Sequence, residues 1–123
     1  MNLKECYEKF GGDFDGVMGR LRREQLVEKF LYKFLDDKSY KLYENAMSKK
    51  DYEQALRAVH TLKGVCQNLS FNRLYESSNQ ITAALKENDY TKAIELSPQL
   101  SGDYYQIVYA VEEYKNAADA AVE

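Results

Sequence analysis

The only histidine of the 123-residue chain, His60, stands in the stretch HTLKGVCQNL, residues 60–69. A neutral imidazole nitrogen is a good nucleophile near pH 7, because the unperturbed pKa of histidine is about 6.5. Such a nucleophile needs no separate base to activate it. A lone histidine beside an apolar stripe is nevertheless an ordinary boundary residue in many proteins, so the residues around His60 decide how it is interpreted.

A helix over residues 52–69 must position this histidine. Its apolar residues follow the three-and-four spacing of one buried helical face, at Tyr52, Ala55, Leu56, Val59, Leu62, Cys66 and Leu69. Asp51 is the expected N-cap, with Gln54 in the capping-box position. At about 100° per residue, His60 falls off the centre of the stripe, with Lys63 between it and the core. We therefore expect an imidazole that the core holds and that stays open to water.

The stretch HTLKGVCQNLS resembles the motif of the histidine-containing phosphotransfer (HPt) domain family. The matching positions are His60, Leu62, Lys63, Gly64 and the pair Asn68-Leu69. The flanking segments YEKFGGD, residues 7–13, and DYEQALRAVHTLKG, residues 51–64, resemble the family too. Two positions depart from the pattern: Val65 replaces a small residue, and Ser70 replaces the glycine that ends the helix in a left-handed conformation.

The resemblance implies a phosphoryl carrier in a two-component phosphorelay. His60 would accept the group from a phospho-aspartate of a receiver domain and pass it to another receiver. Lys63 would offer a mobile positive charge to the phosphoryl oxygens, Gly64 would leave room for the partner, and Gln67 would donate a hydrogen bond. The receiver would bring the aspartate and Mg²⁺, so we expect no metal or cofactor on this chain and no kinase activity of its own.

A polar side chain from the next helix could hold one imidazole nitrogen so that the other points outward. Thr82 is the first candidate by position, and Ser78, one turn earlier, is the second. HPt domains often carry glutamine where this chain has Thr82.

Composition limits the other functions. The net charge of −3 and the pI near 5.3 argue against binding to nucleic acid or to a membrane surface. We expect the basic cluster Arg20, Arg22 and Arg23 to be a solvated helix face, balanced by Glu24 and Glu28. The cysteines Cys6 and Cys66 have neither CxxC nor zinc spacing, which favours a reduced, cytoplasmic protein. No apolar run approaches the roughly 20 residues of a membrane span.

The remaining patterns predict one all-α domain over residues 1–123. Short N-terminal segments precede helices over about 23–35, 40–49 and 72–87, and a brief helix over 90–96 is followed by a new start at Ser97-Pro98. Residues 116–123 lose their apolar anchor and should fray. Short connections make the helices antiparallel neighbours. We therefore expect an antiparallel four-helix bundle, monomeric, with the short N-terminal helices packed at one end.

Two alternatives to the relay remain open. The chain could be an interaction module that binds receivers without being phosphorylated, and Val65 and Ser70 are the only sequence hints for it. It could also be the substrate domain of a hybrid or sensor histidine kinase acting in trans. A di-metal enzyme is excluded, because that site needs Glu-x-x-His on two helices and Arg57 stands three residues before the only histidine. No nucleotide-binding motif supports a kinase.

Overall fold

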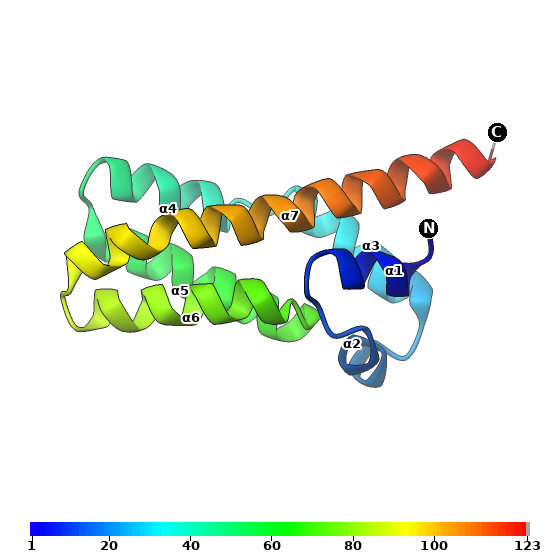
Figure 1. Cartoon of the computed structure of the whole chain (residues 1–123), viewed down its shortest axis with the longest axis horizontal. Coiled ribbons are helices and arrows are strands. Elements are labelled where there is room, and N and C mark those ends of the chain that lie inside the picture. Colours follow the sequence, from blue (N-terminus) through cyan, green and yellow to red (C-terminus); the bar gives the residue numbers. More distant parts are fainter. Residues whose placement is uncertain (123) are drawn as a thin grey trace.

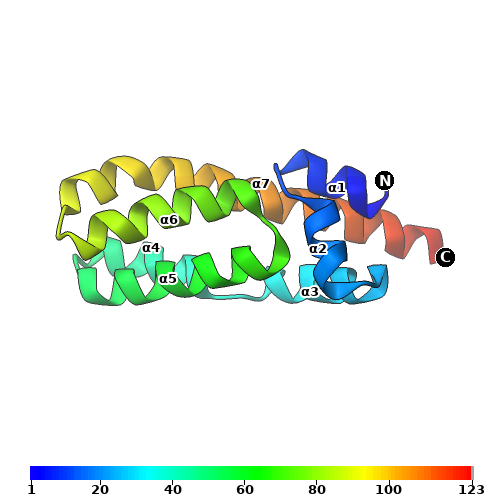
Figure 2. The same ribbon diagram turned by 90° about the horizontal axis from the view of Figure 1, so that it is seen from below.

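The computed structural model describes residues 1–122 and is helical throughout its regular part, so the all-α prediction is confirmed (Figure 1). The helices are α1 (Leu3–Lys9), α2 (Phe14–Leu21), α3 (Glu24–Leu35), α4 (Ser39–Ser48), α5 (Tyr52–Leu69), α6 (Asn72–Lys86) and α7 (Tyr90–Val122). Helices α4 to α7 run in alternating directions along the long axis, and α1 to α3 lie at the end where α5 meets α6 (Figures 1 and 2).

The apolar stripes of the helices face one another in a single core. The largest fully buried side chains come from almost every helix: Tyr7, Phe10, Phe34, Phe71, Leu31, Leu62, Leu74, Ile81, Leu100, Ile107, Val17 and Val27. Truncating any of the leucines, isoleucines and phenylalanines among them to alanine would cost about 2–5 kcal/mol, because a packed core collapses only partly around a cavity. The core therefore fixes how α5 is rotated about its own axis.

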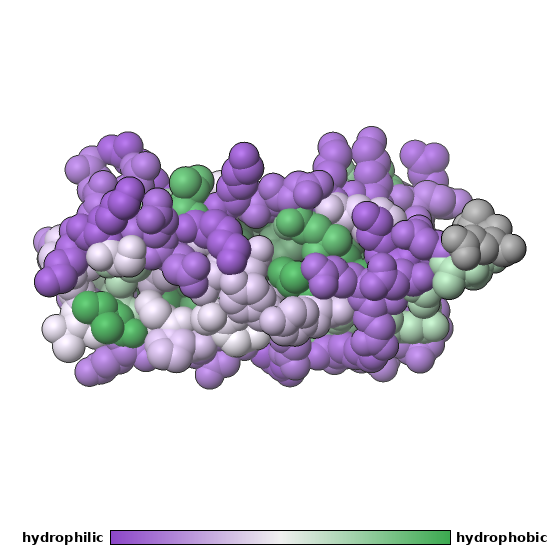
Figure 3. Space-filling model, turned by 90° about the horizontal axis from the view of Figure 1, so that it is seen from above, coloured by the Kyte–Doolittle hydropathy of each residue, from purple (hydrophilic) through white to green (hydrophobic). Residues whose placement is uncertain are grey.

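Tyrosines join α4 to α7. The rings of Tyr40 and Tyr104 stack with centroids 4.2 Å apart, and the hydroxyl groups of Tyr43 and Ser97 are hydrogen-bonded at 2.6 Å. Burial raises the pKa of Tyr40 to about 12, so this seam stays uncharged at physiological pH. On the face shown in Figure 3, hydrophobic residues form separate patches within a largely hydrophilic surface.

The N-terminal helices hold the turn between α5 and α6. The last carbonyls of a helix have no partner inside it, and here the first 20 residues supply several. The Tyr7 hydroxyl donates to the carbonyl of Leu69 at 2.8 Å, and the Asp13 N–H donates to that of Ser70 at 2.8 Å. Arg20 donates to the carbonyls of Gln67 and Asn68 at 3.0 and 3.2 Å. We call these three donors, the side chains of Tyr7 and Arg20 and the backbone N–H of Asp13, the N-terminal clamp.

The prediction that a new helix starts at Ser97-Pro98 is wrong, because α7 is continuous through this dipeptide. It is a single helix that contains Pro98. The Ser97 hydroxyl donates to the carbonyl of Ala93 at 3.0 Å, so this side chain bonds backward along the helix and does not cap a new one. Pro98 is exposed, and so is Ile94, whose carbonyl loses its helical partner to the proline. Water can satisfy that carbonyl at the surface, while buried residues on both sides of the proline keep the helix continuous.

Helix α7 also continues to Val122, beyond Lys115. The fraying expected for residues 116–123 therefore stays a prediction about the helix in solution, and residue 123 lies outside the described residues. No helix in the part of the chain that the structure describes is long and apolar enough to cross a membrane.

Candidate functional site

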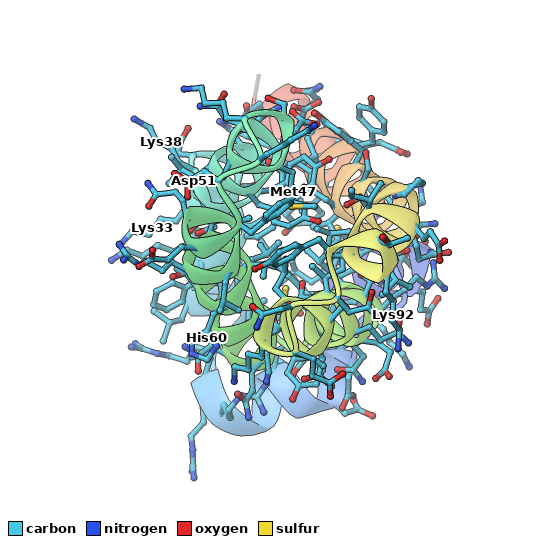
Figure 4. The ribbon with its side chains drawn as sticks, turned by 90° about the vertical axis from the view of Figure 1, so that its left-hand side faces the viewer. Lys33, Lys38, Met47, Asp51, His60 and Lys92 are labelled. Atoms are coloured by element: carbon cyan, nitrogen blue, oxygen red, sulfur yellow. The ribbon has the colours of Figure 1, made fainter. Side chains whose placement is uncertain are left out.

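His60 lies on the outer face of α5, as its sequence position predicts. The start of α5 is fixed by Asp51, whose carboxylate accepts the N–H of Gln54 at 3.2 Å. The buried residues of α5 occupy the opposite side of the helix, so His60 is exposed. Seen from the end of the bundle, its side chain lies at the periphery, on the same side as Lys33 and Lys38, whereas Met47 points inward (Figure 4).

The three motif residues predicted to serve the reaction share this face with His60. Gly64, one turn later, is exposed, and a Cβ built on it would meet no atom within 4 Å. Gln67 is exposed too, whereas Lys63 is half-buried. The structure thus gathers His60, Gly64 and Gln67 on one open helical surface, with Lys63 at its border.

The two cations that flank His60 differ in their partners. Arg57, three residues before it, donates to the carboxylate of Glu53 at 2.6 Å. Lys63, three residues after it, has no carboxylate within 4.0 Å among the described residues, and its Nζ lies 6.0 Å from the ring centroid of Tyr75 on α6. The charge of Lys63 is therefore the one that remains free to meet an anion.

The hydrogen bond predicted between His60 and the next helix is not found. Thr82 is 2 % exposed, and its hydroxyl donates to the carbonyl of Ser78 at 2.7 Å. The Ser78 hydroxyl is fully buried and has no hydrogen-bond partner in the described chain. Both side chains are buried on the inner side of α6, and the Thr82 hydroxyl bonds backward to a carbonyl, as threonine in a helix readily does. The exposed imidazole is on the other side of α5.

Ser70, one of the two departures from the family motif, has a clear structural role. It ends α5 in the left-handed conformation, with φ 58° and ψ 39°, where glycine is favoured. Its hydroxyl accepts a hydrogen bond from the Arg20 guanidinium. Arg20 is exposed, as expected for a solvated helix face, but it also caps the end of α5, about 50 residues away in sequence. No local pattern in the sequence signals that contact.

Two shallow grooves flank the His60 face of α5. The first, of about 370 Å³, lies between α2, α3 and α5 and has an apolar floor; it is lined by Arg20, Leu21, Phe30, Lys33, Phe34, Asp37, Val65, Asn68 and Leu69. Val65, the second departure from the motif, contributes to that apolar floor. The other groove, of about 240 Å³, lies between α4 and α5 and is lined by Ser39, Leu42, Gln54, Arg57, Ala58 and Thr61.

The cysteines take no part in this surface. Cys6 and Cys66 are free and fully buried. Burial raises the pKa of the Cys6 thiol to about 11 and also raises that of Cys66, so both stay protonated near neutral pH. Among the described residues, no group of three or more His, Cys, Asp or Glu side chains could hold a metal ion.

Comparison with known families agrees with this geometry. Residues 25–120 match the family model described as Hpt domain, while no curated protein and no solved structure matches the chain. The match begins after the flank YEKFGGD and includes the whole of α5. Hpt domains are helical phosphocarrier modules of two-component signalling, and they interact with receiver domains and histidine kinases. The match spans well over half of the sequence, and the chain therefore belongs to the Hpt domain family.

Proposed function

We propose that this chain is a phosphorelay carrier that accepts a phosphoryl group on His60 from a receiver domain and passes it to another receiver. The observation that carries the proposal is the exposed His60, with open space above Gly64 one turn away, on a helix of an Hpt-family chain. A nucleophile that must reach into a partner's active site has to project from a surface that the partner can approach.

The chemistry needs little from this chain beyond that exposure. A ring nitrogen of His60 attacks the phosphorus of the partner's aspartyl phosphate, and the N–P bond forms as the P–O bond to the aspartate breaks. The carboxylate leaves with the electron pair of that bond, and the other ring nitrogen keeps its proton. The second receiver reverses these steps with its own aspartate. Phosphoryl transfer depends mainly on in-line positioning and on neutralising the equatorial oxygens.

The neighbouring residues have corresponding roles. Lys63 supplies positive charge to the phosphoryl oxygens, Gln67 supplies a hydrogen bond, and Gly64 leaves room for the partner's loops. Mg²⁺ belongs to the partner receiver. The groove that α5 forms with α2 and α3 and the groove that it forms with α4 offer apolar contact area for docking, which Val65 increases. Ser70 and Val65 have structural roles of their own, so these two departures from the motif no longer favour a non-phosphorylated interaction module.

We further propose that the carrier works as a monomer in the cytoplasm and has no kinase activity of its own. Two free, buried cysteines suit a reducing compartment. A hybrid or sensor kinase would supply the phosphoryl group to the relay, directly or through its receiver.

The test is phosphotransfer from a labelled phospho-receiver to the purified chain, with the His60→Gln variant in parallel. We expect label on the wild-type chain only, lost in acid and retained in base, as phosphohistidine requires. His60 is exposed, so the variant should keep the helical content and the unfolding midpoint of the wild type. Label on the His60→Gln variant, or none on the wild type from several receivers and kinases, would refute the proposal and favour a binding module.

A further inference from the structure

Tyr75 is placed to act on the lysine beside His60. It lies in the first half of α6, the helix that follows α5 and packs antiparallel to it (Figure 2). Its ring is half-buried and packs against the hydrophobic core, so its position is fixed by the fold. The ammonium of Lys63 lies over this ring, 6.0 Å from its centroid. A cation over an aromatic face within about 6 Å is attracted by the negative face of the ring.

An aromatic ring attracts an ammonium group without neutralising its charge. Arg57, on the other side of His60, shows the alternative: its guanidinium is already paired with the carboxylate of Glu53. A carboxylate beside Lys63 would compete with the phosphoryl group for the same charge. A cation–π contact is weaker than a charge-assisted hydrogen bond to a phosphoryl oxygen, so the ammonium can leave the ring when the group arrives.

The ring also limits where the lysine can go. A lysine side chain has considerable rotamer freedom, most of which is lost when its ammonium binds an anion. Contact with Tyr75 confines the Lys63 stem to the seam between α5 and α6, next to the His60 face. Part of the conformational entropy of the Lys63 side chain is therefore lost before the partner docks.

We infer that Tyr75 is a positioning residue for phosphoryl transfer, which holds the Lys63 ammonium at the border of the His60 face without neutralising its charge. The inference rests on the proposed function and adds a residue of α6 to a site otherwise formed by α5. The Tyr75 hydroxyl makes no hydrogen bond within the described chain, so the aromatic face, and not the hydroxyl, is the part that acts.

Two substitutions distinguish the effect of the aromatic face of Tyr75 from the effect of its size. Tyr75→Phe keeps the aromatic face, whereas Tyr75→Leu keeps an apolar side chain without it. With a labelled phospho-receiver, we expect the transfer rate to be unchanged in Tyr75→Phe and about two- to five-fold lower in Tyr75→Leu. On a Lys63→Gln background, Tyr75→Leu should cause no further loss, because the residue acts through the lysine.

A second readout reports the contact without any transfer. In NMR spectra of the full chain, the protons on Cε of Lys63 should be shifted upfield by the ring in the wild type and in Tyr75→Phe. They should return to the values of an exposed lysine in Tyr75→Leu. Circular dichroism and the urea midpoint of each variant show whether the fold is kept.

The outcomes are distinct. An equal transfer rate in Tyr75→Leu and the wild type overturns the inference alone, as does an equal further loss on the Lys63→Gln background, which would indicate a merely structural role. Absence of the upfield shift in the wild type also overturns it. Absence of label on the wild-type chain overturns the proposed function, and the positioning role with it.

Discussion

Gly64 allows the docking surface to be tested separately from the stability of the fold. It lies inside α5, where glycine costs about 1 kcal/mol relative to alanine because its backbone loses more freedom on folding. A Cβ at this position would meet no atom within 4 Å, so no steric term opposes the gain. Gly64→Ala should therefore stabilise the chain by about 1 kcal/mol, which corresponds to a rise in Tm of roughly 3–5 °C.

The same substitution should impair transfer, since the added group stands where the partner must approach His60. We expect Gly64→Ala to slow phosphotransfer by several-fold and Gly64→Leu by on the order of 10- to 100-fold, the effect of displacing a reacting group by about 1 Å. The measurements are thermal unfolding followed by circular dichroism, and single-turnover transfer from a labelled phospho-receiver.

Gly102 offers a matched control within the chain. It lies in α7, across the bundle from α5 (Figure 4), and a Cβ there also meets no atom within 4 Å. Gly102→Ala and Gly102→Leu should leave transfer unchanged, and Gly102→Ala should raise the Tm as Gly64→Ala does. Unchanged transfer in Gly64→Leu, or an equal loss of transfer in Gly102→Leu, would refute the argument that the open space above Gly64 serves the partner.

Three further predictions concern the fold. Arg20→Ala should lower the free energy of unfolding by about 2 kcal/mol in urea titrations, because it leaves carbonyls and the Ser70 hydroxyl without a donor. On that background, Ser70→Gly should restore about 1 kcal/mol by relieving the left-handed backbone. No restoration would contradict this account. Pro98→Ala should raise the unfolding free energy by about 1–3 kcal/mol by returning a helical hydrogen bond, and a loss of stability would show that the proline is needed. Burial raises the pKa of Cys6 to about 11 and also raises the pKa values of Cys66 and of buried tyrosines such as Tyr40. The unfolded chain therefore loses these protons at a lower pH than the folded chain, and the free energy of unfolding should fall between about pH 9 and 11. Equal unfolding free energies at about pH 8 and about pH 10.5 would contradict this account.

The sequence was informative wherever the cause of a structure is local. The helix predicted over 23–35 is observed at Glu24–Leu35, and the one predicted over 72–87 at Asn72–Lys86, because each depends on its own apolar spacing. The exposure of His60 followed from the same spacing in α5, and the cap at Asp51 from the side chain alone.

Features that depend on distant contacts could not be predicted in this way. Arg20 looks like any surface arginine until the fold brings it to the end of α5. The dipeptide Ser97-Pro98 has the local signature of a helix start, and only the packing around it makes α7 continuous. At Thr82, position suggested a bond to His60, but the backbone carbonyl of Ser78 is a nearer acceptor for the hydroxyl. At Ser97-Pro98 tertiary structure overrides the local preference, and at Arg20 it adds a distant contact, whereas at Thr82 a local bond to the backbone replaces the predicted contact with His60.

The N-terminal clamp has a consequence for how the chain folds. It joins residues that are 47 to 62 positions apart in sequence, whereas α4, α5 and α6 each pack on the next helix along the chain. Contacts of such long sequence separation require a large loop to close and form slowly, while contacts between neighbouring helices form early. Closing the clamp is then a late event in folding. Opening it would break the core packing of Tyr7, which is fully buried, so its opening is a costly excursion of the native state. Because the clamp holds the C-terminal end of α5, such an excursion would loosen the last turns of that helix before it reached His60.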